Sequence, residues 1–150
     1  MNPFKVVPFF IALLCFGLVS CCTKQKPMSG DDIPFREASH YFVRNDVKSY
    51  TSRKIETEEE FFEIFGMAAV MGTDGLPTEI DFNSQYVIAI ILPPTNKDAV
   101  IQPLRFTKGK TLDFTYRVKR GKSPRSYSFV PYYIAIVDKK YNGDVTITEK

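Results

Sequence analysis

An unbroken apolar run over residues 86–92 constrains the fold of this chain more than any other feature. Pro93-Pro94 ends that run, and a second apolar run, 132–137, follows Pro131. Runs this short, bounded by proline, predict β-strands that are covered on both faces. The sequence therefore predicts a sheet that lies inside a folded domain.

The region between the two runs predicts a hairpin with one wet face. Polar and apolar residues alternate over 111–119. This alternation places the apolar residues on the inner face of a strand: Leu112, Phe114, Tyr116 and Val118. The preceding strand, 99–106, contains Pro103, which indicates an edge or a bulge. The predicted turns and loops are 108–110, 121–125 and the hairpin turn Asn142-Gly143.

One helix is predicted. Thr57 and Glu60 form a capping box, and a wide apolar stripe at helical spacing follows in Phe61, Phe62, Ile64, Phe65, Ala68 and Ala69. Residues 72–75 and Pro77 end the pattern. A helix followed by strands with short turns predicts an α+β fold, with one main helix packed on an antiparallel, mostly meander-connected β-sheet.

The first twenty residues predict a secretory signal. Lys5 is their only charge, and an almost wholly apolar stretch follows over 6–19. That stretch is shorter than the about 20 apolar residues that cross a bilayer. The sequence Leu18-Val19-Ser20-Cys21 resembles the lipobox of bacterial lipoprotein signals. This resemblance implies that Cys21 is lipidated; the alternatives are an ordinary secretory signal or a single retained anchor helix.

The chain then divides into a signal at 1–20, a flexible tether at 21–34 and a single domain at 35–150. The tether is rich in Lys, Gln, Pro, Ser, Gly and Asp and has no apolar period. It lacks the acidic cluster after the cysteine that some bacterial lipoproteins use for surface export. We therefore expect a lipid-anchored protein of the bacterial cell envelope, at the periplasmic face rather than at the cell surface.

Charge is divided unevenly along the domain. Residues 31–81 contain 12 acidic and 5 basic side chains, whereas residues 97–125 contain 9 basic and 2 acidic ones. Such asymmetry indicates either an interaction surface or two halves that attract each other within one fold. We favour the second interpretation.

No set of residues with the spacing of a catalytic or metal site is found. His40 is the only histidine, and its neighbours Tyr41 and Phe42 indicate a half-buried structural residue. Cys15 leaves with the signal and Cys21 carries lipid, so Cys22 alone remains and no disulfide or cysteine–metal site is expected. We predict a protein that is not an enzyme and that uses no cofactor or metal.

Basic and aromatic residues cluster on the predicted strand at 111–119 and on and beside the loop after it. The candidate binding residues are Arg117, Lys119, Arg120, Lys122, Arg125 and Tyr127. This mixture is typical of nucleic-acid binding, but an exported lipoprotein rarely meets nucleic acid, so we predict none. An acidic protein surface, an acidic glycan or anionic lipid suits the compartment better. A solvated strand edge with no binding role is the alternative.

Residues 55–147 resemble the C-terminal domain of the PrcB family, subunits of protease complexes. The likeness lies in the acidic and aromatic helix at 57–65, in Asp81-Phe82 before the central strand, and in the strand led by Pro131. It implies association with a secreted protease. The sequence thus predicts a membrane-anchored protein-binding module for an envelope protein partner, with an accessory or inhibitory protease subunit, acting through residues 121–127, as the alternative.

Overall fold

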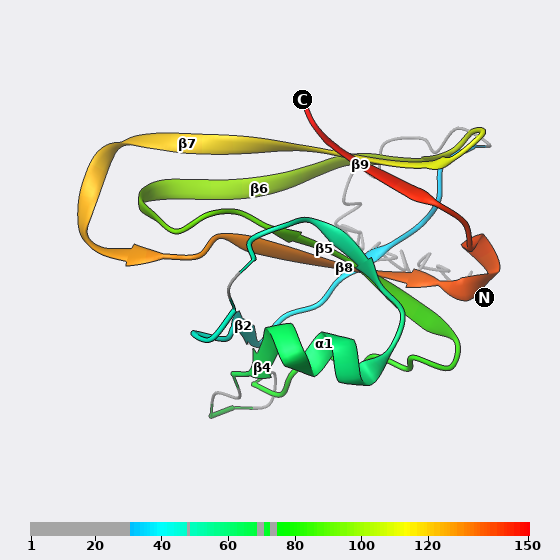
Figure 1. Ribbon diagram of the computed structural model, residues 1–150, viewed down its shortest axis with the longest axis horizontal. Helices are drawn as coiled ribbons and strands as arrows, with labels where there is room; N and C mark the ends of the chain where they lie inside the picture. Colours follow the sequence, from blue (N-terminus) through cyan, green and yellow to red (C-terminus); the bar gives the residue numbers. More distant parts are fainter. Residues whose placement is uncertain (1–30, 48, 69–70, 73–74) are drawn as a thin grey trace, which may run out of the picture.

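The computed structural model describes residues 31–47, 49–68, 71–72 and 75–150. β-Strands make up most of these residues, and there is one short α-helix (Figure 1). The predicted signal, the lipid attachment at Cys21 and the tether as far as residue 30 lie outside the described residues and stay predictions.

A four-stranded antiparallel sheet forms the middle layer. Its strands, in spatial order, are β1 (Arg36–Glu37), β8 (Tyr132–Asp138), β5 (Gln85–Ile91) and β3 (Arg53–Ile55). β5 and β8 pair along their whole length, from Gln85 opposite Asp138 to Ile91 opposite Tyr132. Both strands are buried on both faces, as their apolar runs predict.

A second sheet covers one face of the middle layer. It consists of β6 (Thr95–Lys108), β7 (Leu112–Phe129) and β9 (Val145–Glu149). β6 and β7 are antiparallel, whereas β9 runs parallel to β7. Between the sheets, Tyr86 and Ile88 share a core with Phe106 and Phe114, and the Phe114 ring meets Phe35 edge-on at 5.2 Å between centroids.

The helix covers the other face. α1 (Glu58–Ile64) packs Phe61 and Ile64 on Val87 and Ala89 of β5, next to a two-stranded ribbon of β2 (Tyr41–Val43) and β4 (Phe65–Met67). Figure 1 shows the three layers, with β6 and β7 on one side of β5 and β8 and α1 on the other. The middle sheet is therefore buried from both sides.

The helix begins as predicted and ends earlier. The Thr57 hydroxyl accepts a hydrogen bond from the Glu60 amide at 3.2 Å, which confirms the N-cap. The helix stops at Ile64 because the next three residues pair with β2 as a strand. There Gly66 lies under the Phe42 ring, where an added Cβ would come within 2.4 Å of Cζ. The prediction that the helix continues beyond Ile64 was wrong, because the residues that follow form a strand. Ala69 lies outside the described residues.

The expectation of a mostly meander-connected sheet is wrong. β8 pairs with β5 across the inserted β6–β7 hairpin, and β9 joins β7 rather than β8. Asn142-Gly143 is consequently not a hairpin turn: the chain leaves β8 through a short 3-10 helix, Lys139–Tyr141, and crosses to the other sheet. Gly143 adopts a positive φ of 156° in this crossing.

The tether is shorter than predicted, because the domain includes residues 31–34. Ile33 is only 4% exposed and belongs to the core between the sheets. Asp32 bridges to Thr107, and the Lys108 amide donates to the Asp31 carbonyl at 2.9 Å. The boundary between tether and domain was placed at 34 because the preceding residues are mostly polar. The buried Ile33 side chain shows that the domain begins before that boundary.

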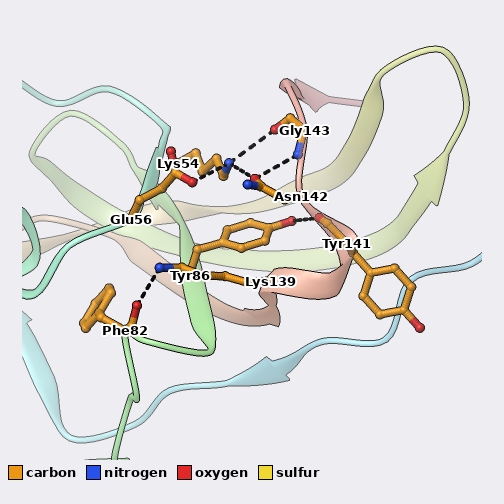
Figure 2. Close-up of polar contacts among 8 residues, drawn as sticks. All are labelled: Lys54, Glu56, Phe82, Tyr86, Lys139, Tyr141, Asn142 and Gly143. Carbon is orange, nitrogen blue, oxygen red and sulfur yellow. Dashed lines mark hydrogen bonds and ion pairs between the residues drawn. The ribbon is translucent and has the colours of Figure 1, made fainter.

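A lysine fastens the crossing segment to the middle sheet (Figure 2). The Lys54 amine pairs with Glu56 at 2.8 Å, donates to the Gly143 carbonyl at 3.3 Å and lies 4.7 Å from the centroid of the Tyr86 ring. The Tyr86 hydroxyl donates to the Tyr141 carbonyl at 2.8 Å. Burial, followed by the charge of Glu56, raises the pKa of Tyr86, so this hydroxyl remains a donor further into the alkaline range than an exposed tyrosine would.

Candidate functional site

The candidate residues lie on a two-stranded ribbon that folds back on itself. β5 continues into β6 and β7 continues into β8, and pairing persists between them: the Leu92 amide donates to the Pro131 carbonyl at 2.9 Å, and Thr95 faces Phe129. Pro93-Pro94 starts the bend. Figure 1 shows β7 passing around the outside of β6 at this end of the molecule.

The outer strand of the bend is longer than the inner one. β6 takes four residue steps from Thr95 to Ala99, whereas β7 takes nine from Phe129 to Arg120, with register shifts on both sides of Lys97. Extra residues on one strand bend and twist a ribbon. We call residues 120–129 the arc. The loop predicted at 121–125 is wrong, since these residues belong to β7.

Three of the predicted binding residues are exposed cations with no ion pair to another described residue. Arg117 and Lys119 lie just before the arc, opposite Gln102 and Val100, on the face of β7 that points away from the core. Lys122 lies in the arc. This part of the candidate site is a cationic strip along the outside of the ribbon.

Arg120 is already paired with a carboxylate of its own domain. Its guanidinium forms a bidentate ion pair with the Glu149 carboxylate, with distances of 2.7 Å between Nη1 and Oε1 and 3.3 Å between Nη2 and Oε2. The hydrogen bond to Glu149 raises the pKa of Arg120. The pair connects the start of the arc to the end of β9, so this predicted binding residue has a structural contact.

Arg125 holds the arc against β6. It forms an ion pair with Asp98 and a hydrogen bond to the Tyr127 hydroxyl, and both contacts raise its pKa. Its guanidinium also lies 5.5 Å from the Tyr127 ring centroid and 5.8 Å from that of Phe129. Gly121 packs on Asp98 so closely that an added Cβ would be 2.8 Å from the Asp98 Cβ. These contacts fix a segment whose side chains are mostly exposed.

A cavity of about 300 Å³ opens beside the bend. Its apolar wall consists of Leu92, Pro93, Pro94, Ala99 and Pro131. Lys97, Asp98 and Arg120 supply the charged part of the lining. Sequence reasoning did not select Lys97, Asp98 or the prolines as site residues, although the Pro93-Pro94 doublet was a visible signal of a bend.

His40 lies elsewhere, at a second cavity of about 370 Å³ next to Tyr132 and Tyr133. It is half-buried, as predicted, and it is the only described non-glycine residue with a positive φ, 63°. Its carbonyl accepts a hydrogen bond from the Ala68 amide at 2.8 Å. Within the described part of the chain, no group of three or more His, Cys, Asp or Glu side chains is placed to hold a metal ion.

The acidic residues near α1 and the cationic strip lie on opposite sides of the middle sheet. Glu56, Glu58, Glu59 and Asp81 line a cavity of about 510 Å³ near the start of α1, whereas the cationic strip lies on the β6–β7 side. Among the ion pairs of described residues, only Arg105 with Asp32 joins the two stretches. The favoured interpretation was that the acidic and basic stretches attract each other within the fold. One ion pair supports it.

Comparison with protein-family models, with curated proteins and with solved structures gives no match. In the ranges that the structure describes, no helix is long and apolar enough to cross a membrane.

Proposed function

We propose that this protein is a lipid-anchored, non-enzymatic module of the bacterial cell envelope that binds another envelope protein through the arc and the adjoining outer face of β7. One observation carries the proposal: β7 presents Arg117, Lys119 and Lys122 as exposed cations that form no ion pair with another residue the structure describes. Lipid attachment at Cys21 would place this surface in the envelope. Nucleic acid is not expected as a partner there.

The chemistry of the strip favours an acidic protein surface as the partner. Unpaired cations on a fixed strand create a positive potential that accelerates encounter with an acidic surface and weakens with salt. The arc loses little conformational freedom on binding, because Arg125 and Gly121 already fix it to Asp98. Arg120 and Arg125 belong to the scaffold, so the charge that a partner meets is that of the other three cations.

The test is crosslinking in intact cells, followed by purification of the full-length lipoprotein. A triple variant, Arg117→Glu, Lys119→Glu and Lys122→Glu, is compared with a matched control, Lys108→Glu with Lys110→Glu, at the exposed far turn of the same hairpin. We expect a partner that the native chain and the control capture, that the triple variant loses, and that higher salt weakens. Equal capture by all three chains would overturn the proposal.

Lipid anchoring is tested separately. The native chain should incorporate labelled fatty acid and sediment with membranes, and Cys21→Ser should do neither. Cys22→Ser is the matched control, since it changes the adjacent thiol and should leave labelling unchanged. Labelling of the Cys21→Ser chain would contradict attachment at that residue.

A second candidate function is an accessory or inhibitory subunit of an envelope or secreted protease. The supporting observation is that residues 122–128 are all exposed in an extended strand that Arg125 fixes near its middle. Protease clefts bind extended, pre-organised segments, and the resemblance to the PrcB family points the same way. Addition of the purified chain should change the rate or lifetime of a co-expressed envelope protease; unchanged values for both would remove this candidate.

A further inference from the structure

The cavity beside the arc suggests what kind of protein segment the arc binds, an inference that rests on the proposed function. We propose that the partner inserts one large apolar side chain into this cavity and places a neighbouring carboxylate on Lys97. The recognised element is thus an acidic extended peptide segment with a single apolar anchor residue.

The shape of the cavity supports a side chain as the occupant. Its volume of about 300 Å³ lies at the lower limit of ligand pockets, which span about 300–1,000 Å³. Three proline residues, Pro93, Pro94 and Pro131, form much of its apolar wall, together with Leu92 and Ala99. Proline rings are rigid, so the wall loses little freedom when it is covered.

The charges around the cavity indicate an anionic neighbour for that side chain. Asp98 is already neutralised by Arg125, and Arg120 is already neutralised by Glu149. Lys97 is exposed and forms no ion pair within the described residues. The lining therefore has one unmatched charge, and it is positive. A carboxylate complements it, whereas a lysine or arginine would be repelled.

The arrangement has the anatomy of an interface centre. Binding energy at protein interfaces concentrates where a large side chain fills a rigid apolar pocket, and the surrounding charges mainly determine orientation and specificity. Here the pocket lies beside Ala99, and the exposed cations Lys119 and Lys122 lie on the strand that pairs with β6. Register places Arg120 beside Ala99 at the pocket, whereas Lys119 lies beside Val100 on the opposite face of the ribbon, so a peptide in the pocket meets Lys97 rather than Lys119.

The experiment uses the full-length chain in detergent and a fluorescent peptide, Gly-Asp-Glu-Phe-Glu-Asp-Gly, with binding followed by anisotropy. Two control peptides replace Phe by Ser, or every acidic residue by its amide. We expect the native chain to bind the first peptide at least tenfold more tightly than the serine control, since burial of one large apolar side chain is worth about that factor or more. It should bind the first peptide severalfold more tightly than the amide control, which loses the attraction to the exposed Lys97. Equal binding of the three peptides, or no binding of the first at millimolar concentration, would overturn the inference.

Two variants locate the contact. Ala99→Leu fills the cavity and should weaken the first peptide about tenfold or more, whereas Val100→Leu, its neighbour on the opposite face at 56% exposure, should leave affinity within about twofold. Lys97→Glu should abolish the preference for acidic over amide peptide, which keeps the test informative if Ala99→Leu fails to fold. Unchanged binding by Ala99→Leu and Lys97→Glu would refute the site.

The two proposals fail in different ways. If partner capture is lost in the Arg117, Lys119 and Lys122 variant but survives in Ala99→Leu and Lys97→Glu, the binding function stands and the cavity is not its centre. If the cavity variants lose both the peptide and the captured partner, the inference and the function are supported together.

Discussion

The first part of β7, residues 112–118, alternates between core and solvent, whereas residues 122–128 of the same strand are exposed without alternation. The first part lies over the middle sheet, where Leu112, Phe114 and Tyr116 fill the space between the layers. The arc extends past that layer, so no core selects one face of the strand. Its position depends instead on pairing with β6 and on the contacts of Arg125 with Asp98 and Tyr127.

The two parts of β7 are therefore held in place differently: the first by the core, the second by strand pairing and by contacts at the surface. Substitutions in residues 112–118 act on the core and therefore on global stability. Substitutions of the exposed side chains at 122–128 act on groups that water already reaches, and they should alter binding or local opening with little effect on the global free energy of unfolding.

The largest expected effect comes from a core residue of the first part. Phe114 is fully buried and contacts the rings of Phe35 and Phe106, so Phe114→Ala should lower the free energy of unfolding by about 3–5 kcal/mol. Tyr127→Ala in the arc, at 54% exposure, should change it by less than about 1 kcal/mol. Denaturant titration measures both, and equal losses would break the comparison.

A smaller loss is expected where the arc meets β6. Gly121→Ala places a Cβ 2.8 Å from the Asp98 Cβ, and because that atom is close to the backbone, relief requires the strands to move apart. We expect a loss of about 1–2 kcal/mol. Gly109→Ala is the matched control, since its nearest atom would be 3.6 Å away. A Gly121→Ala chain as stable as the control would show that the close approach has no energetic role.

Removal of the Arg125 ion pair should loosen the arc without destabilising the domain. Asp98→Asn keeps the size of the side chain and removes its charge. We expect an unchanged denaturation midpoint and severalfold faster trypsin cleavage after Lys122 or Arg125, measured by mass spectrometry of the fragments. Asp113→Asn, on the same hairpin near its turn, is the control and should leave cleavage in the arc unchanged. A shifted midpoint would mean that the arc is coupled to the core.

The smallest effect concerns acid, and it should not distinguish the two parts of β7. Hydrogen bonds from the Ser84 hydroxyl and the Asn83 amide lower the pKa of Asp81, in the turn before β5. A carboxyl with a lowered folded pKa stabilises the fold above its unfolded pKa, and that contribution disappears as pH falls through the folded pKa. Asp81→Asn should therefore lower stability slightly at pH 6, and the difference should shrink as pH falls below the ordinary value of 3.8 and vanish below the lowered folded pKa. A difference that grows at low pH would contradict this assignment.

Local patterns predicted the elements, and long-range pairing decided the topology. The Thr57 cap, the apolar runs of β5 and β8 and the alternation at 112–118 are short-range signals, and each is confirmed. The pairing of β5 with β8 and the parallel alignment of β9 join residues far apart in sequence, which periodicity does not encode. The meander and the Asn142-Gly143 hairpin were wrong for this reason.

The candidate site was predicted by residue type but not by role. The cluster of cations was visible in the sequence, and exposure is confirmed for Arg117, Lys119 and Lys122. The carboxylates that neutralise Arg120 and Arg125 lie on other strands, so no local motif marks them. The bend was hidden because Gly121, Ser123 and Pro124 are typical of loops, although here they lie in a strand whose extra residues carry it around a corner.

The position of β9 has a consequence for the order of folding. This strand is made after β8, yet it lies parallel to β7 and adds Val145 and Ile147 to the apolar layer between the sheets. A parallel partner cannot form by zipping from a tight turn and must close a long loop, which is a slow step. A nascent chain that emerges from its amino end would thus leave one side of β7 unpaired until β9 has been made, and would need protection from aggregation until then.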